Sequence, residues 1–372
     1  MIRGEKGASC LQKVGAKKNR LTGRHLATRI PIFGLDWHIR QSPAQQELAN
    51  DPLQPYIQFE QFGWNGTSMP DLPVKQFKNM PIVFFHLPPP QHLYHGANMR
   101  VVWIPMWDQA RGYNLEWWQS LPKSLRVVAF SKEVSVRAKS AGLSTLDLRF
   151  FKLPDQFTPA NWKTGRVLFY WNRTGLVDKN FLSRLCQSLD IEHLIFRRQV
   201  DPRIPAHFDY SLPPWLGKTC VQEIRSNTFL PKREYMDIIN RANVFIAPRA
   251  SEGVGLTFIE ALARGCAVFA FDAPTMNEYI THKRNGYLFQ RYAYSLWNHT
   301  REKALRWLDH FLIRYANMQP RFACPVTGWQ DWDDVQSLDL QRLGDNARLS
   351  QAAGFRKWID SIPQYASFIL DW

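Results

Sequence analysis

The sequence predicts an α/β protein with two domains, each built on a mainly parallel β-sheet. The chain has 372 residues, a length that exceeds one ordinary domain and suits two. Short apolar runs alternate with helical patterns, as expected when helices connect parallel strands. Residues 154–164 (PDQFTPANWKT) are polar and rich in turn-forming residues, and the alternation starts again after them. We therefore place the domain boundary in this segment.

Apolar runs in the first half are typical of strands. They are Arg29–Phe33, Pro81–His86, Met99–Ile104, Leu125–Phe130 and Leu146–Phe151. Prolines directly after the second and third runs end those strands, because proline cannot continue a strand ladder. A helix is expected over 133–140, and Gly142 suits the position just after a helix end.

The second half begins with its most apolar segment, 165–171 (GRVLFYW), as expected for a strand that is buried on both faces. The expected order then continues with helix 178–190, strand 191–196, helix 231–242, strand 243–247, helix 255–264 and strand 266–271. Apolar residues at helical spacing predict helices over 293–317 and 345–369. Residues 212–230 fit neither pattern.

The net charge of +15 is concentrated at the start of the chain. Residues 1–40 contain nine Lys or Arg residues and only two acidic residues, Glu5 and Asp36. We interpret residues 1–28 as a basic, mobile extension, and a basic arm that contacts anionic lipid is the alternative. The mildly basic remainder suits a sugar nucleotide, a lipid phosphate or a membrane surface. Nucleic acid is not expected as a partner, because no basic–aromatic module is present.

The cysteines and the apolar runs indicate the compartment. The five cysteines are scattered and form no CxxC pair, which argues against a disulfide framework or a zinc site. No apolar run is long enough to span a bilayer, and the first 30 residues lack the apolar core of a secretory signal. We expect a cytoplasmic protein, and association with the inner face of the membrane stays open.

Residues 248–265 carry the clearest functional signal. A strand ends near Pro248, a glycine-containing turn follows, and a helix opens near Gly255. Ligands of parallel α/β sheets bind beyond the carboxyl ends of the strands, and a helix N-terminus there suits a diphosphate. Glu252 and Glu260 add carboxylates that can accept paired hydrogen bonds from vicinal hydroxyls. Taken singly, Glu252 also fits a turn cap and Glu260 a solvated helix residue.

This stretch resembles a known motif. It reads Pro248-Arg-Ala-Ser-Glu252-Gly-Val-Gly-Leu-Thr-Phe-Ile-Glu260-Ala-Leu-Ala-Arg-Gly265. It is similar to the hallmark of retaining, nucleotide-sugar-dependent glycosyltransferases of the GT-B fold, family-4 (group 1) type, in which seven residues separate two glutamates. Arg249 stands where that family has serine. The resemblance covers about 165–290 well and 80–157 loosely.

The resemblance implies two Rossmann-like, doubly wound parallel-sheet domains that face a cleft. It implies that Glu252 contacts the donor hexose and that Glu260 binds the ribose hydroxyls. It also implies a set of residues that hold the diphosphate and the hexose: Arg173, Lys179, Gly253, Val254, Gly255, Leu256 and Thr257. Arginine can grip phosphate in a bidentate manner, whereas lysine acts as a mobile point charge.

The acceptor side of the site is matched less closely. His86 ends a strand where the family often has histidine. The histidine that the family commonly has after the next strand is absent, and Asp108 is the only carboxylate there. We carry both with Glu252 as candidate catalytic residues, and a structural role for His86 is equally compatible. Glu278 occupies the glutamate position of the family's Gly-Gly-x-x-Glu motif, but the stretch reads Ala273-Pro274-Thr275-Met276-Asn277-Glu278 and keeps neither glycine.

The implied domain plan has four parts. Residues 1–28 form the extension, 29–157 the acceptor-side domain, and 158–340 the nucleotide-sugar domain. Residues 341–372 form a C-terminal helix that packs back on the first domain.

The implied reaction moves a sugar from a nucleoside diphosphate sugar to the hydroxyl of a glycan or lipid-linked glycan of the cell envelope, with retention. We expect no metal and no cofactor. The one DxD-like candidate, Asp331-Trp332-Asp333-Asp334, lies in an irregular connection, and Arg173 and Lys179 would neutralise the diphosphate instead.

Two functions from other classes are compatible with parts of the sequence. A non-catalytic protein that binds a sugar or nucleotide on the same fold remains the alternative function, because a fold does not guarantee chemistry. A nicotinamide-dependent Rossmann enzyme is disfavoured, because no GxGxxG follows a first strand.

Overall fold

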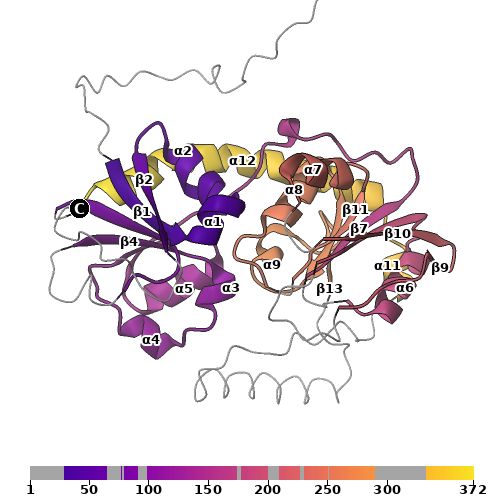
Figure 1. Cartoon of the computed structure of the whole chain (residues 1–372), viewed down its shortest axis with the longest axis horizontal. Coiled ribbons are helices and arrows are strands. Elements are labelled where there is room, and N and C mark those ends of the chain that lie inside the picture. The colour runs from indigo at the N-terminus through magenta and orange to yellow at the C-terminus, as the bar shows by residue number, and fades with distance from the viewer. Residues whose placement is uncertain are drawn as a thin grey trace, which may run out of the picture.

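The computed structural model describes residues 29–64, 77, 79–90, 99–173, 177–199, 209–226, 230–249, 251–289 and 332–372. Two α/β domains lie side by side, and one long helix runs along both of them (Figure 1). The predicted fold class is therefore confirmed. The extension expected over 1–28 and the helix expected over 293–317 lie outside the described residues.

The first domain contains a six-stranded sheet in the order β2-β1-β3-β4-β5-β6. All of its strand pairs are parallel. The strands are β1 (Arg29–Leu35), β2 (Gln58–Trp64), β3 (Pro81–His86), β4 (Arg100–Pro105), β5 (Arg126–Ala129) and β6 (Ser144–Asp147). The helices are α1 (Asp36–Gln41), α2 (Asp51–Leu53), α3 (Trp107–Ala110), α4 (Leu115–Gln119) and α5 (Lys132–Ser140), and a π-helical turn (Gln46–Asn50) runs directly into α2.

One strand predicted in the first domain differs from the sequence-based expectation. The strand expected over Leu146–Phe151 is wrong, because the observed β6 ends at Asp147. Leu148 and Phe150 are buried, but Phe150 packs against Trp358 of the C-terminal helix instead of continuing the sheet. The alternating apolar residues of this segment are therefore explained by packing against the C-terminal helix and not by a strand.

The second domain contains a seven-stranded sheet in the order β13-β12-β11-β7-β8-β10-β9. Its pairs are parallel except β9–β10, at one edge. The strands are β7 (Val167–Asn172), β8 (His193–Arg198), β9 (Trp215–Leu216), β10 (Thr219–Arg225), β11 (Val244–Ile246), β12 (Ala267–Phe271) and β13 (Tyr287–Phe289). The helices are α6 (Lys179–Ser188), α7 (Lys232–Ile239), α8 (Leu256–Arg264), α9 (Met276–Tyr279) and α11 (Trp332–Gln336).

The long helix α12 (Leu340–Leu370) contacts both domains (Figure 1). Near its start, Gly344 lies so close to α8 that an added Cβ would come within 2.1 Å of the Gly265 carbonyl oxygen. Further along, Trp358 and Tyr365 pack against Phe130, which follows β5. The C-terminal helix thus adheres to the second domain at its start and to the first domain towards its end.

The carboxyl ends of strands from the two sheets meet at the domain interface. Asp108, which follows β4, forms an ion pair of 3.2 Å with Arg249, which follows β11. Since ligands of parallel α/β sheets bind beyond the carboxyl ends of strands, this interface is where a site is expected.

Candidate functional site

The turn between β11 and α8 is shaped by one glycine. Gly255 precedes the helix with a φ of +81°, a left-handed conformation that glycine adopts without steric cost. An added Cβ would lie 2.0 Å from a ring carbon of Phe258 and 3.2 Å from the Cβ of Glu252. Gly255 has no side chain to cap the helix, so the first N–H groups of α8 are not satisfied by a side-chain cap there and can serve an anion.

The helix α8 is packed tightly into the second domain. Phe258, Ile259 and Leu262 are fully buried. The two glutamates of the motif are also buried, with 7% of Glu252 and 9% of Glu260 exposed. A buried carboxylate needs hydrogen bonds or a counter-charge, so the alternative of a solvated Glu260 is wrong.

Glu260 is paired with a lysine that was not among the predicted site residues. Lys152, in the segment after β6, donates a hydrogen bond of 2.5 Å to Glu260 Oε1. The same ammonium group lies 2.8 Å from Glu47 Oε2, on the π-helical turn of the first domain. Burial lowers the pKa of Lys152, but the Glu260 and Glu47 carboxylates outweigh burial and raise it overall. Lys152 is therefore a buried cation that joins the two domains.

His86 and Asp108 lie on the first-domain side of the same interface. His86 ends β3 with a φ of +80° and is buried. Burial lowers its pKa, the Asp108 carboxylate opposes this, and Arg249 lowers the pKa further. The imidazole is therefore neutral at neutral pH and can exchange hydrogen bonds with a polar ligand.

Asp108 reaches the loop between β11 and α8, which carries Arg249, Gly253 and Gly255 and is called the glycine loop below. Its Oδ2 accepts from Arg249, and its Oδ1 is buried and accepts no hydrogen bond from the described residues. A Cβ on Gly253 would come within 3.0 Å of Asp108 Oδ1 and of Met106 Cβ. The structure thus brings the glycine loop of the second domain against the acceptor-side candidates of the first.

Arg173 and Lys179 lie beyond the carboxyl end of β7, the strand next to β11 in the sheet. The Arg173 guanidinium lies over the Trp171 ring at 4.7 Å. Lys179 is the exposed first residue of α6, with its ammonium 5.7 Å from the Tyr210 ring centroid. Both cations are therefore placed at the sheet edge where a diphosphate is expected.

A third cation at this edge was missed. Arg197, next to the end of β8, is 1% exposed and lies over Trp171 at 4.1 Å. It donates to the neutral Gln199, while its Nε is buried and finds no hydrogen-bond partner among the described residues. Burial lowers its pKa to about 10, so it stays charged at neutral pH. The sequence signal was two consecutive arginines that end an apolar strand.

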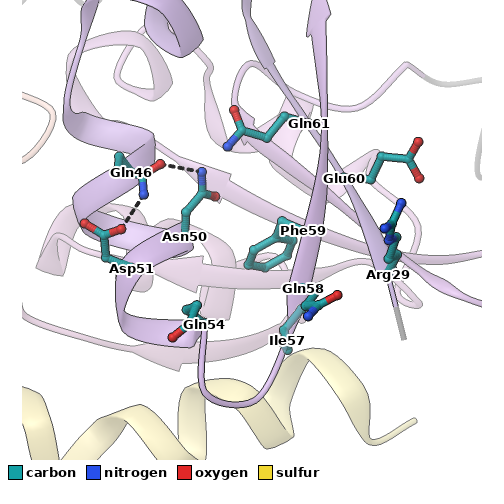
Figure 2. A pocket seen from close by; sticks show the side chains of 10 residues that line it. All are labelled: Arg29, Gln46, Asn50, Asp51, Gln54, Ile57, Gln58, Phe59, Glu60 and Gln61. Atoms are coloured by element: carbon teal, nitrogen blue, oxygen red, sulfur yellow. Dashed lines mark hydrogen bonds between the residues drawn. The ribbon is translucent and has the colours of Figure 1, made fainter. Parts of the chain in front are cut away.

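Two pockets differ in their relation to the predicted residues. The larger, with a volume of ≈ 470 Å³, lies between the helical segment 46–53 and β2 (Figure 2), and none of its lining residues is a predicted site residue. The smaller, of ≈ 330 Å³, is lined by Lys132, Glu133 and Arg149 of the first domain and by Pro274, Asn277 and Glu278 of the second.

Glu278 connects the domains at this smaller pocket. Its carboxylate accepts from the backbone N–H of Lys132 at 2.9 Å, at the start of α5, and pairs with Arg149 at 2.9 Å. A negative charge at a helix N-terminus is favourable. The smaller pocket therefore belongs to the domain interface, and the larger one does not.

The DxD-like segment shows a structural role where it is described. Asp334 pairs with Lys283 and accepts from the Tyr287 hydroxyl at 3.4 Å, whereas Asp331 lies outside the described residues. Within the described residues, no group of three His, Cys, Asp or Glu side chains could hold a metal ion. Nor is any helix in those ranges both long and apolar enough to cross a bilayer.

Comparison with a protein-family model matches residues 223–307 to glycosyl transferases group 1. The matched segment contains α7, β11, the glycine loop, α8 and both motif glutamates. No curated protein matches the sequence significantly.

Comparison with solved structures finds several similar folds at low identity. Sucrose-phosphate synthase from Thermosynechococcus elongatus is 13% identical, with a TM-score of 0.52 over 91% of this chain and 98% of that one. HepE from Anabaena, in complex with UDP, is 13% identical, with a TM-score of 0.54 over the same shares. A glycosyltransferase from Rickettsia africae is 11% identical, with a TM-score of 0.55 over 93% and 100%. The expected GT-B fold and the group 1 glycosyltransferase segment are therefore both confirmed.

Proposed function

We propose that this chain, which has the GT-B fold and a group 1 glycosyltransferase segment, moves a sugar from a nucleoside diphosphate sugar to an acceptor hydroxyl. The observation that carries the proposal is the opening of α8 at the carboxyl edge of the second sheet. There, the left-handed Gly255 leaves the first helix N–H groups uncapped by any side chain of its own, and Glu252 and Glu260 flank them. Helix N–H groups suit a diphosphate, and the carboxylates suit sugar and ribose hydroxyls.

Each candidate residue then has a task. Glu252 binds the donor hexose, Glu260 binds the ribose, and the backbone over 253–257 holds the hexose and the diphosphate. Arg173 and Lys179 offset the charge that develops on the leaving nucleoside diphosphate. These are preorganised positive groups aimed at one end of the breaking bond.

The bond changes in this proposal are those that the resemblance to retaining GT-B glycosyltransferases implies, in which the leaving diphosphate itself takes the acceptor proton. The acceptor oxygen bonds to the anomeric carbon on the face that the diphosphate leaves. The bond between that carbon and the diphosphate oxygen breaks with its electron pair, and the departing oxygen takes the acceptor proton. The product keeps the anomeric configuration, and no metal is required.

The acceptor enters from the first domain, where His86 and Asp108 face the glycine loop. His86 is buried and neutral at neutral pH, so in this proposal it orients the acceptor by hydrogen bonding. Asp108 offers a buried oxygen without a described partner, which suits an acceptor hydroxyl. We propose a glycan or lipid-linked glycan of the cell envelope as acceptor, with the reaction in the cytoplasm and peripheral contact with anionic membrane through the basic N-terminal residues.

The test starts from the donor. The Anabaena protein is in complex with UDP, so UDP-sugars are the first donors to screen, followed by GDP-, ADP- and TDP-sugars. Thermal unfolding should show stabilisation by one nucleotide class, because a ligand that binds the folded state raises its melting temperature. Glu260→Ala should lose that stabilisation. If no nucleotide sugar stabilises the wild type, the proposal fails.

The remaining alternative is a sugar or nucleotide binder without catalysis. Release of free sugar and nucleoside diphosphate from the donor without added acceptor would exclude it. Donor binding without release, and without transfer to envelope glycans, would favour it.

A further inference from the structure

We propose that Lys152 is a positioning residue of the donor site, which holds the Glu260 carboxylate oriented towards the donor ribose and links it to Glu47 of the first domain. This inference rests on the proposed function. It goes beyond it by assigning a role to a residue outside the glycosyltransferase segment at 223–307.

The contacts of Lys152 leave little freedom to Glu260. The ammonium lies 2.5 Å from Glu260 Oε1 and between 2.8 and 3.0 Å from the two Glu47 oxygens. Lys152 is 8% exposed. A lysine ammonium has three donors, and these short contacts use it on both carboxylates. One Glu260 oxygen is held in place, and Oε2 can accept from a ribose hydroxyl.

Charge explains why a cation is needed at this position. Burial raises the pKa of Glu260, Lys152 opposes this, Glu47 raises it, and Lys232 at the start of α7 lowers it. Tyr235 on α7 also faces this group, since Glu260 contributes to raising the Tyr235 pKa. A protonated carboxyl offers one fewer acceptor site and a donor that a diol does not need. Lys152 therefore keeps Glu260 in the form that binds two hydroxyls.

The first-domain end of the contact is held firmly. Glu47 lies on the π-helical turn, where Asn50 donates to Gln46 at 3.0 Å and Gln46 bonds to Asp51 (Figure 2). These bonds fix the turn that presents Glu47 to Lys152. Because Glu47 and Glu260 come from different domains, their shared cation makes the donor site sensitive to how the domains are placed.

The test compares Lys152→Met with wild type in isothermal titrations of the nucleotide sugar that stabilises the wild type in the thermal screen of UDP-, GDP-, ADP- and TDP-sugars, between about pH 6 and about pH 8.5. Wild-type affinity should change by less than about threefold over this range. In Lys152→Met, affinity should fall by at least about tenfold at the acid end and recover as pH rises, because Glu260 then ionises without help.

Controls separate positioning from general damage. Glu260→Gln should lose affinity equally at every pH, and Lys152→Met added to it should cause no further loss. Lys152→Arg should restore most of the affinity and remove the pH dependence. Should the methionine variant fail to fold, Lys152→Gln replaces lysine by an uncharged, partly aliphatic side chain, and its donor affinity can be compared with wild type over the same pH range.

The outcomes distinguish the two proposals. If the wild type binds no nucleotide sugar of the donor screen, the proposed function itself fails. If the wild type binds one and the Lys152 variants bind it equally well, or lose affinity equally at all pH values, the role of Lys152 is overturned and the proposed function stands.

Discussion

Replacing Gly255 by alanine tests the geometry on which the donor site depends. The new Cβ would lie 2.0 Å from Phe258, whose side chain is fully buried and cannot move aside into solvent. It would also lie 3.2 Å from the Cβ of Glu252. The substitution therefore perturbs the helix start and the motif glutamate together.

The magnitude can be worked from two contributions. A left-handed conformation costs a residue with a Cβ about 1–2 kcal/mol, and overpacking a buried position costs about 1–3 kcal/mol. The sum is about 2–5 kcal/mol, and its midpoint corresponds to a fall of roughly 7–14 °C in the melting temperature of a domain of this size. Donor affinity should fall by at least about tenfold, since the helix N–H groups and Glu252 both move.

Gly217 provides a matched control for this prediction. It also has a left-handed φ, of +62°, but an added Cβ there would meet nothing within 4 Å. Gly217→Ala should therefore cost only the conformational part, about 1–2 kcal/mol, and leave donor affinity unchanged. Thermal unfolding with and without the donor measures both effects. Equal losses of stability in the two variants, or full donor affinity in Gly255→Ala, would refute the reasoning.

Three further predictions address the interface. Asp108→Asn removes a partly exposed ion pair with Arg249 worth roughly 1 kcal/mol, so the equilibrium constant between the observed arrangement, with the two domains in contact, and any more open one should fall about fivefold. An unchanged radius of gyration in small-angle scattering would contradict this. The pKa of His86 is lowered by burial, so the unfolded state binds its proton first and stability should fall as pH drops through about 6.5. Asparagine tolerates the left-handed backbone at this position, so in urea unfolding the stability of His86→Asn should fall less with decreasing pH than that of the wild type. If the two stabilities depend on pH with the same slope, His86 is not the cause. Arg197→Met removes a buried charge that no described carboxylate pairs, so the free energy of unfolding should stay equal or rise by about 1 kcal/mol while donor binding weakens; a loss above about 3 kcal/mol in urea titration would show that the guanidinium stabilises the fold instead.

The sequence predicted buried parallel strands well, because their signal is a short apolar run with clear ends. The run Pro81–His86 coincides with β3, and α8 and β12 begin within one residue of their expected starts. By contrast, β2 was missed and β10 fell in a segment that fitted neither pattern. Both lie towards the edges of their sheets, where polar side chains face solvent and weaken the apolar signal.

The candidate site was predictable only where one continuous segment carries it. The glycines and both glutamates of the motif lie within one strand–turn–helix unit, so their order along the chain indicates their proximity. Lys152 and Glu47 could not be predicted, because no local pattern records a distance between two domains. The role assigned to each motif residue stays a prediction until a donor is bound.

The long C-terminal helix determines how the two domains can move. Over its 31 residues it spans about 46 Å, and it forms a second connection between the domains beside the segment after β6. Two connections permit the domains to rotate relative to each other about the line that joins the connections, and they oppose sliding of one domain past the other.

The start of this helix is held to the second domain by close packing and hydrogen bonds. Gly344 packs against the Gly265 carbonyl, and Arg348 donates to the carbonyls of Ala263 and Pro154, each at 3.0 Å. The helix α12 can therefore bend most easily towards its C-terminal end, where Pro363 removes one helix hydrogen bond. The helix is thus held at its start by the second domain, and any change in the domain interface would reach the first domain at Phe130, against which Trp358 and Tyr365 pack.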